Sequence, residues 1–282
     1  MADTKLTYSD AVIMKALLSK DFSLIGGAFE DSALTAIKKC AFQGAGATLA
    51  KIVLPSITAI PSGALRDCTG LTTLDITWGE ILTMGSDALR GARLPDSALT
   101  LSKLTSIGDG AFAGCTALKS FSAPVLSSSG GTDAAYGTAQ QGVFRDCTGL
   151  TSVSLPAIRT TSQYFFRGCT ALADVTLTGL TQIGGFTFYN CTGLTKLKFP
   201  AAVTNVSGNV FNGCTSLTAV IFPNITSVPT ATTASFTGSP ILSGSCYVYV
   251  PESLLSSVKA ASNWSAVADM IRACEDYPEI CG

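Results

Sequence analysis

The cysteines are the residues of this chain with the richest potential chemistry, and the absence of histidine limits what they can do. The 282 residues include ten cysteines and no histidine. The chain therefore has no Ser-His-Asp triad, no Cys-His nucleophile pair, no imidazole metal ligand and no imidazole acid–base catalyst. No two cysteines are spaced as Cys-x-x-Cys, so the sequence supports neither a zinc site nor a thioredoxin-type redox motif.

The spacing of the cysteines indicates packing rather than chemistry. Six of them stand three residues after a phenylalanine or leucine that recurs along the chain: Cys68, Cys115, Cys147, Cys169, Cys191 and Cys214. Because free cysteine behaves as a small buried hydrophobe, we predict a buried column of free thiols in preference to a ladder of disulfides. Strands about 4.8 Å apart would still bring such cysteines within disulfide range. Cys274 and Cys281 could either close a short disulfide or remain thiols.

The elements that position these cysteines are the copies of a repeat, which is clearest between residues 143 and 213. Phe144, Phe166 and Phe188 recur every 22 residues, and each is followed by cysteine after three residues and leucine after six. Weaker copies are anchored at Phe42, Leu65, Leu89, Phe112, Phe211 and Phe236. A period of roughly 20–30 residues is typical of a solenoid, whose coils bury their apolar faces against one another. We predict coils of 22 to 25 residues.

Each coil contains a short strand with alternating inward and outward residues. Val153 and Leu155 are two residues apart and should point into the core, whereas Ser152 and Ser154 should point outward. Pro156 ends the strand because it has no N–H for the ladder. Stacked coils then form a parallel sheet with two outward rows: Val53, Asp75, Thr100, Ser122, Ser154, Thr176, Lys198 and Ile221, and Lys51, Thr73, Ser120, Ser152, Asp174, Lys196 and Ala219.

The chain divides into a solenoid and two caps. Residues 28–251 form the predicted solenoid, after an N-terminal helical cap over residues 1–27 with its helix at 9–20. Residues 252–282 form a C-terminal helical cap, in which a helix over 252–273 is anchored by Trp264. The step from Phe112 to Phe144 is 32 residues, which predicts an insertion loop at about 122–142. Insertions in solenoids often lie on the binding face, and Tyr136 is a candidate loop contact.

Composition excludes several classes of function. Only 13% of the residues are charged and the net charge is −1, so nucleic acid and anionic membranes are not expected partners. No apolar run approaches the roughly 18 residues of a membrane span, so membrane insertion is not expected. The carboxylates are scattered, and no glycine-rich phosphate loop lies between a strand and a helix. We therefore predict no enzymatic activity, no cofactor and no metal.

The repeat resembles a known family. The pattern Ala-Phe-x-x-Cys-x-x-Leu-x-x-Val-x-Leu-Pro, best preserved at 111–118 and 210–223, resembles the BspA-like leucine-rich repeats of bacterial surface proteins. The segment 249–255 is similar to the capping segment that follows such repeats. The resemblance covers roughly residues 28 to 272. It implies a β-rich, right-handed leucine-rich repeat solenoid with parallel strands, no enzymatic activity, and a role in binding, typically adhesion to host proteins or surfaces.

Two functions are consistent with these observations. The first is an adhesive module, secreted or on a bacterial cell surface, that recognises a host-surface or matrix protein or a glycan. The second is a tail-associated host-recognition or structural protein of a phage virion, which would bind bacterial envelopes; Met1 without a recognisable export signal favours it.

The candidate ligand face comprises outward strand residues. It contains Asp75, Thr100, Ser122, Ser152, Ser154, Asp174, Thr176, Lys196 and Lys198. A shallow face rich in hydroxyl groups would bind its ligand through many modest hydrogen bonds. The alternative is that these are ordinary solvated strand positions. No aromatic row is expected on this face, so a sugar-stacking platform is not supported.

Overall fold

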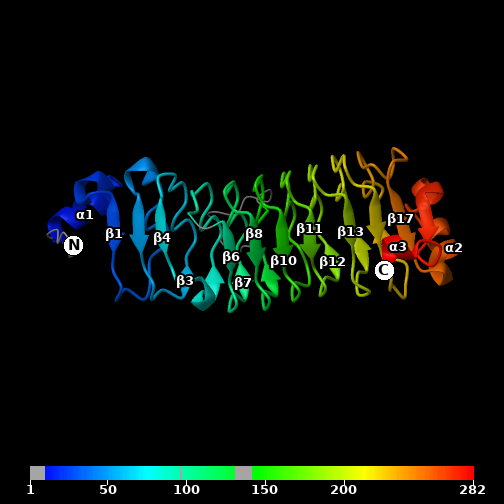
Figure 1. Cartoon of the computed structure of the whole chain (residues 1–282), viewed down its shortest axis with the longest axis horizontal. Helices are drawn as coiled ribbons and strands as arrows, with labels where there is room; N and C mark the ends of the chain where they lie inside the picture. The colour runs from blue at the N-terminus through cyan, green and yellow to red at the C-terminus, as the bar shows by residue number, and fades with distance from the viewer. Residues whose placement is uncertain (1–9, 96, 131–141) are drawn as a thin grey trace.

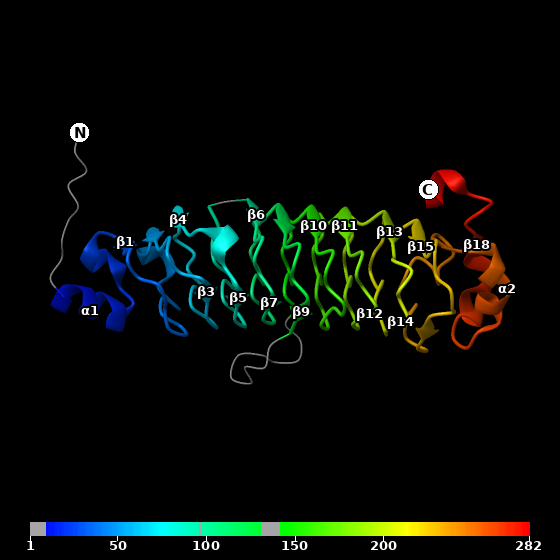
Figure 2. The ribbon, with the colours of Figure 1, turned by 90° about the horizontal axis from the view of Figure 1, so that it is seen from below.

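The computed structural model describes residues 10–95, 97–130 and 142–282. The chain forms an elongated solenoid of about ten turns, capped at both ends by short helices (Figure 1). Figure 2 shows two rows of strands on opposite sides of the solenoid, with the longer strands along the upper side and the shorter ones along the lower side.

The longer strands form one continuous side, called here the strand face. All neighbouring strands pair in parallel, in three sheets with the orders β1-β2-β4, β6-β8-β10-β11 and β13-β15-β17-β18. Their bounds are β1 Ala28–Glu30, β2 Lys51–Val53, β4 Thr73–Asp75, β6 Ala98–Thr100, β8 Ser120–Ser122, β10 Ser152–Ser154, β11 Asp174–Thr176, β13 Lys196–Lys198, β15 Ala219–Ile221, β17 Tyr247–Val250 and β18 Ile271–Ala273.

The shorter strands form the second side of the coils. Their parallel sheets have the orders β3-β5-β7-β9 and β12-β14-β16. The bounds are β3 Ala59–Ile60, β5 Thr83–Met84, β7 Ser106–Ile107, β9 Ser128–Ser129, β12 Gln182–Ile183, β14 Asn205–Val206 and β16 Thr230–Ala231. Short 3-10 turns lie at Phe22–Ile25, Gly46–Thr48, Trp78–Glu80 and Ser265–Met270.

The register confirms the predicted outward rows. Ser120 lies opposite Ser152, and Ser152 lies opposite Asp174; Ser154 lies opposite Thr176 in the other row. The inward residue between them, Val153, is only 3% exposed. The period-2 pattern of the sequence was therefore sufficient to separate the side chains that point into the coil from those that point away from it.

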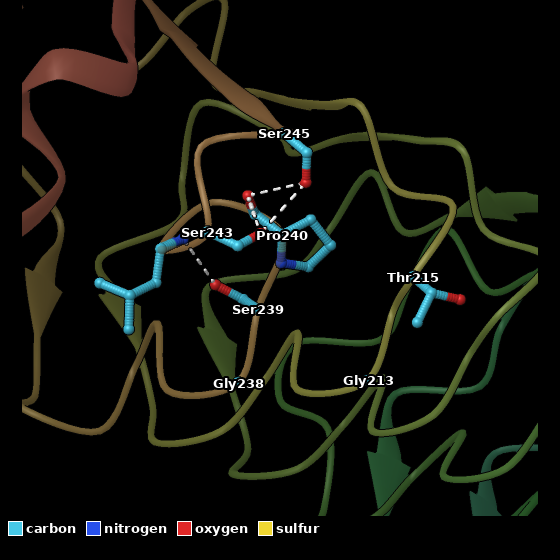
Figure 3. Close-up of a pocket in the computed structure, with 8 residues that line it drawn as sticks. Gly213, Thr215, Gly238, Ser239, Pro240, Ser243 and Ser245 are labelled. Atoms are coloured by element: carbon cyan, nitrogen blue, oxygen red, sulfur yellow. Dashed lines mark hydrogen bonds between the residues drawn. The ribbon is translucent and has the colours of Figure 1, made fainter.

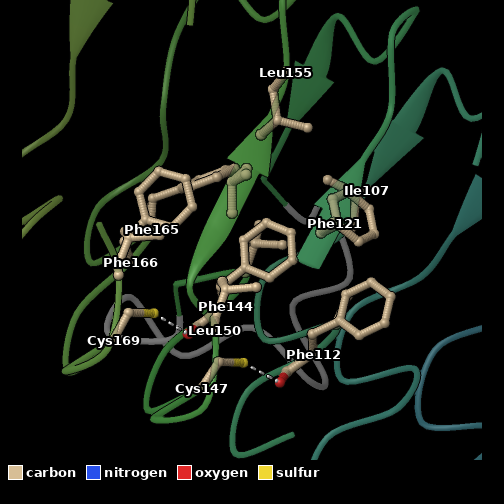
Figure 4. Close-up of a cluster of buried hydrophobic side chains, with 14 of the residues drawn as sticks. Ile107, Phe112, Phe121, Phe144, Cys147, Leu150, Leu155, Phe165, Phe166 and Cys169 are labelled. Atoms are coloured by element: carbon tan, nitrogen blue, oxygen red, sulfur yellow. Dashed lines mark hydrogen bonds between the residues drawn. The ribbon is translucent and has the colours of Figure 1, made fainter. Parts of the chain in front are cut away.

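The anchors of the coils form a stacked aromatic column in the core (Figure 4). The ring centroids of Phe112 and Phe144 are 5.6 Å apart, those of Phe144 and Phe166 are 5.6 Å apart, and those of Phe166 and Phe188 are 5.5 Å apart. These four rings are fully buried. Each ring therefore packs against the rings of both neighbouring coils as well as against its own coil. A cavity made by truncating one ring would remove contacts from three coils.

The predicted thiol column is confirmed. All six cysteines of the repeat are buried free thiols. The Sγ of Cys169 donates a hydrogen bond to the carbonyl of Phe144, one coil earlier, at 3.0 Å, and Cys147 and Cys214 bond the carbonyls of Phe112 and Phe188 in the same way. Burial raises the pKa of the Cys147 and Cys214 thiols to about 12, so both are protonated donors at neutral pH.

Each coil turns sharply on both sides of its anchor. In most coils the residues two before and two after the anchor adopt positive φ, for example Asp87 at 54° and Gly91 at 65° around Leu89. Glycine, aspartate and asparagine tolerate this left-handed region best and fill most of these positions. These corner positions connect the second side of one coil to the strand face of the next.

The C-terminal cap differs from the predicted continuous helix over 252–273. α2 spans Glu252–Ala260, and the chain returns through Asn263, whose φ is 66°, to β18. Ile271 and Ala273 are buried because they alternate along this last strand, which pairs with β17. Trp264 is the anchor that was predicted: it is 1% exposed, and its indole N–H donates to the carbonyl of Pro229 at 2.7 Å. The N-terminal helix α1 spans Asp10–Ser19.

The insertion begins later than predicted. Residues 122–130 belong to a regular coil, because Ser122 ends β8, Leu126 is fully buried, and β9 pairs with β7. The rest of the predicted loop, including Tyr136, lies largely outside the described residues.

Candidate functional site

The open part of the strand face contains a shallow groove. It has a volume of about 200 Å³ and crosses the middle sheet, β6-β8-β10-β11. Six of the nine predicted ligand-face residues line it: Thr100, Ser122, Ser152, Ser154, Asp174 and Thr176. The groove exists because successive coils present serine at outward positions, where longer side chains would fill the space.

The polar groups of this groove are free to bind a ligand. Within the described residues, none of the six side chains donates or accepts a hydrogen bond or forms an ion pair with another protein group. Serine and threonine hydroxyls can donate and accept, whereas the Asp174 carboxylate only accepts. The groove can therefore satisfy both the N–H and the C=O groups of a bound molecule.

The C-terminal end of the strand face is covered by the chain itself. Residues 274–282, called here the clasp, cross β13 to β17 and include the short helix α3, Pro278–Cys281 (Figure 2). The Lys196 ammonium donates to the carbonyl of Ile280 at 2.9 Å. Lys198 donates to the carbonyls of Cys281 at 3.0 Å and Gly282 at 3.2 Å. Both lysines that were predicted as ligand contacts thus donate hydrogen bonds to main-chain carbonyls of the clasp.

Apolar contacts secure the clasp. The outward residues Ala219, Ile221 and Tyr249 are 4%, 0% and 3% exposed because they form a small core with Cys274, Tyr277, Ile280 and Cys281. The rings of Tyr249 and Tyr277 meet edge to face with centroids 5.3 Å apart. Cys274 and Cys281 are free thiols within this core.

Sequence reasoning missed the clasp, although a signal for it was present. The outward positions of β15 are alanine and isoleucine, where β10 carries two serines. A strand that is apolar on both faces is expected to be buried on both sides. Applying that rule to Ile221 would have predicted a cover over this end of the sheet.

One further residue of the predicted ligand face lies apart from the groove. Asp75 is exposed on β4, in the first sheet of the strand face, and does not line the groove. Tyr136 lies outside the described residues.

The turns around the anchors form a third side of the solenoid, called here the turn side. A second depression lies on this side, next to the turns that follow Phe211 and Phe236 (Figure 3). It has a volume of about 480 Å³ and is lined by residues of the loop 238–245 together with Gly213 and Thr215. Its hydroxyl groups bond the loop itself: Ser243 and Ser245 both donate to the carbonyl of Pro240, at 3.2 and 3.3 Å. Ser239 donates to the carbonyl of Phe236 at 2.6 Å. These bonds explain the fold of the loop and leave the strand-face groove as the better candidate site.

The described part of the chain contains no cluster of three or more cysteine, aspartate or glutamate side chains arranged to hold a metal ion. Within the same residues, no helix is both long and apolar enough to cross a membrane.

Comparison with known proteins identifies the repeat. A family model described as BspA type leucine rich repeat region (6 copies) matches residues 35–139 and 137–244. No curated protein matches the chain.

Several solved structures are similar to the chain. A leucine-rich repeat protein from T. pallidum shares 23% identity over 46% of this chain and 61% of its own, with a TM-score of 0.39. One from Bacteroides ovatus shares 18% identity over 87% of this chain and 82% of its own, with a TM-score of 0.34. A leucine-rich cell surface protein from Faecalibacterium prausnitzii shares 19% identity over 81% of this chain and 65% of its own, with a TM-score of 0.42. The aligned region thus spans less than two thirds of the first and third of these proteins.

Proposed function

The chain belongs to the BspA-type leucine-rich repeat family, and we propose that it is a non-enzymatic binding module that holds a polypeptide ligand on the open part of its strand face. One observation carries this proposal. The clasp is a polypeptide segment bound to the same face, through lysine bonds to its main-chain carbonyls and an apolar core. The groove on the middle sheet lies beside the clasp on the same face.

The groove suits an extended peptide better than a sugar ring. Its lining alternates hydroxyl groups with the Asp174 carboxylate and presents no outward aromatic side chain. Each hydroxyl-to-main-chain hydrogen bond would contribute about 0.5–1.5 kcal/mol net, so several along the groove are needed for a useful affinity. The parallel rows of Ser122 and Ser154, and of Ser152 and Asp174, supply such a series.

We further propose that the module acts in adhesion at a bacterial cell surface. The support is the family resemblance of the repeat, whose members typically bind host proteins or surfaces. The ligand would then be an extracellular-matrix or host-surface protein.

A binding screen tests the proposal with a variant that places two arginine side chains in the groove. Purified chain would be offered to immobilised matrix proteins, glycans and bacterial envelopes, beside the double variant Ser154→Arg/Thr176→Arg. The matched control is Thr83→Arg/Gln182→Arg, which adds the same charge at exposed strand positions on the second side. Binding to a matrix protein that only the first variant loses is the expected result.

The other outcomes count against the proposal in different ways. Binding to glycans alone would contradict a polypeptide ligand. Binding to bacterial envelopes would favour the phage-virion function. Binding that survives Ser154→Arg/Thr176→Arg would move the site away from the groove.

A further inference from the structure

A row of arginines lies along the turn side of the solenoid. Four coils carry arginine directly after the anchor: Arg66, Arg90, Arg145 and Arg167. The first three have carboxylate partners within the chain. Arg66 lies 3.2 Å from Asp87 and 3.4 Å from Asp67, Arg90 lies 3.4 Å from Asp87, and Arg145 lies 3.0 Å from Asp146.

These partners always come from the corner positions of the repeat. Asp67 and Asp146 stand two residues after an anchor, and Asp87 stands two residues before one. The equivalent positions around Arg167 hold Gly168, Tyr164 and, in the next coil, Phe186. Arg167 accordingly has no ion pair and no side-chain hydrogen bond among the described residues. The corner positions of the repeat therefore place a carboxylate beside the first three arginines but not beside Arg167.

Aromatic rings hold this unpaired arginine in place. The Arg167 guanidinium carbon lies 5.4 Å from the centroid of the Tyr164 ring and 5.4 Å from that of Tyr189. The Tyr164 ring stacks on Phe186 at 4.7 Å and 18°. All four side chains are half-buried. A guanidinium between aromatic faces is oriented by cation–π attraction and keeps the N–H groups at its edge available.

The backbone at this cluster is unusual. Tyr164 and Phe186 have φ values of 60° and 58°, at corner positions where other coils have Gly63, Asp87 or Asn209. A bulky side chain is a genuine outlier in the left-handed region and costs free energy. Two such residues in consecutive coils, stacked beside one unpaired arginine, indicate a selected feature of the surface.

We propose that Arg167 binds a carboxylate from outside the chain, carried by an acidic segment of a protein partner. The guanidinium fork matches a carboxylate in bidentate geometry, and the positive edges of the surrounding rings also favour an anion. A sugar ring would need a free aromatic face. Here the Tyr164 ring already contacts Phe186 on its face and Arg167 by its cation–π contact. This site lies on the turn side and is separate from the groove of the strand face.

Paired peptides test the site on the full chain. A short peptide of alternating glutamate and glycine, and its glutamine counterpart, would be titrated against the wild type, Arg167→Gln and the charge-matched control Arg159→Gln. We expect the glutamate peptide alone to bind, with affinity reduced about tenfold or more by Arg167→Gln and about twofold or less by Arg159→Gln. Equal losses in both variants, or no binding of the glutamate peptide, would overturn the proposal. So would binding of a uronic-acid oligosaccharide without binding of the peptide.

A second variant places a carboxylate of the chain itself beside Arg167. Phe186→Asp places an aspartate at the position that Asp87 occupies relative to Arg66, where aspartate tolerates the backbone better than phenylalanine. We expect Phe186→Asp to abolish peptide binding while the chain remains folded by thermal melting. Unchanged peptide binding in this folded variant would contradict a role for Arg167 as the anion site.

Discussion

The open and clasped parts of the strand face share one scaffold and differ only in what points outward. β10 and β15 each pair in parallel, and in equivalent register, with their own neighbouring strands. Their central residues, Val153 and Val220, are buried in the same core. Their outward residues are serines in β10, and alanine and isoleucine in β15. The first set leaves a groove and the second holds the clasp. In this solenoid the inward residues determine the fold. The outward residues determine whether the strand face is open to a ligand or covered by the chain's own C-terminal segment.

High pH should abolish the difference between the two parts by unfolding both. Burial raises the pKa of Cys68, Cys147, Cys214 and Cys246 to about 12, from 9.0. The unfolded chain therefore loses these protons first, and the stability that depends on them is complete below pH 9 and is lost as pH rises from 9 towards 12. At pH 10, above the unfolded pKa and below the folded one, each thiol would lower the free energy of unfolding by roughly 1 kcal/mol, and the four together by several kcal/mol. Urea unfolding at pH 8 and pH 10 measures this, and equal midpoints would contradict the thiol column.

Phe188→Ala should destabilise both parts together. Its ring is fully buried in the continuous anchor column, so truncation should cost about 3–5 kcal/mol. Thr176→Ala, on the open face, should change the free energy of unfolding by about 0.5 kcal/mol or less. Denaturant unfolding compares the two variants. Similar, small effects would mean that the assigned register of the coil is wrong.

Ile221→Ser should affect only the clasped part. The side chain is 0% exposed beneath the clasp, and its loss from that small core should cost about 1.5–3 kcal/mol. The control is Thr176→Ser, the outward position of β11 on the open part. Hydrogen exchange should show faster exchange in residues 274–282 for Ile221→Ser alone. Protection that stays the same would show that the clasp does not depend on this contact.

Lys198→Met should have the smallest effect. It removes hydrogen bonds to the carbonyls of Cys281 and Gly282 but leaves the apolar core of the clasp, so a loss of about 1 kcal/mol is expected. Lys119→Met, an exposed lysine beside the open part, is the charge-matched control. The readout is again the exchange rate of residues 274–282. An equal change in both variants would assign the effect to net charge.

The sequence predicted the features that repeat and missed those that occur once. Phe144, Cys147 and Val153 recur at fixed intervals, so their burial and register followed from the period. The clasp has no second copy, and its position depends on a contact between Lys198 and a residue 84 positions later. The break at Asn263 likewise depends on one local backbone angle. The Arg167 cluster was missed because it is marked by the lack of aspartate at the corner positions near Arg167. Only the folded coil shows which positions are corners and that they lie close to this arginine.

The hydrogen bonds of the two parts also connect very different lengths of chain, and this determines how the molecule should respond to pulling. The thiol of Cys169 bonds a carbonyl 25 residues earlier, so each link joins one coil to its neighbour. The clasp joins residues 83 and 84 positions apart and ties the last coils to one another. Under tension between the chain ends, the open coils should extend in small successive steps. The clasped coils should instead resist as a unit and release their length in a single larger step.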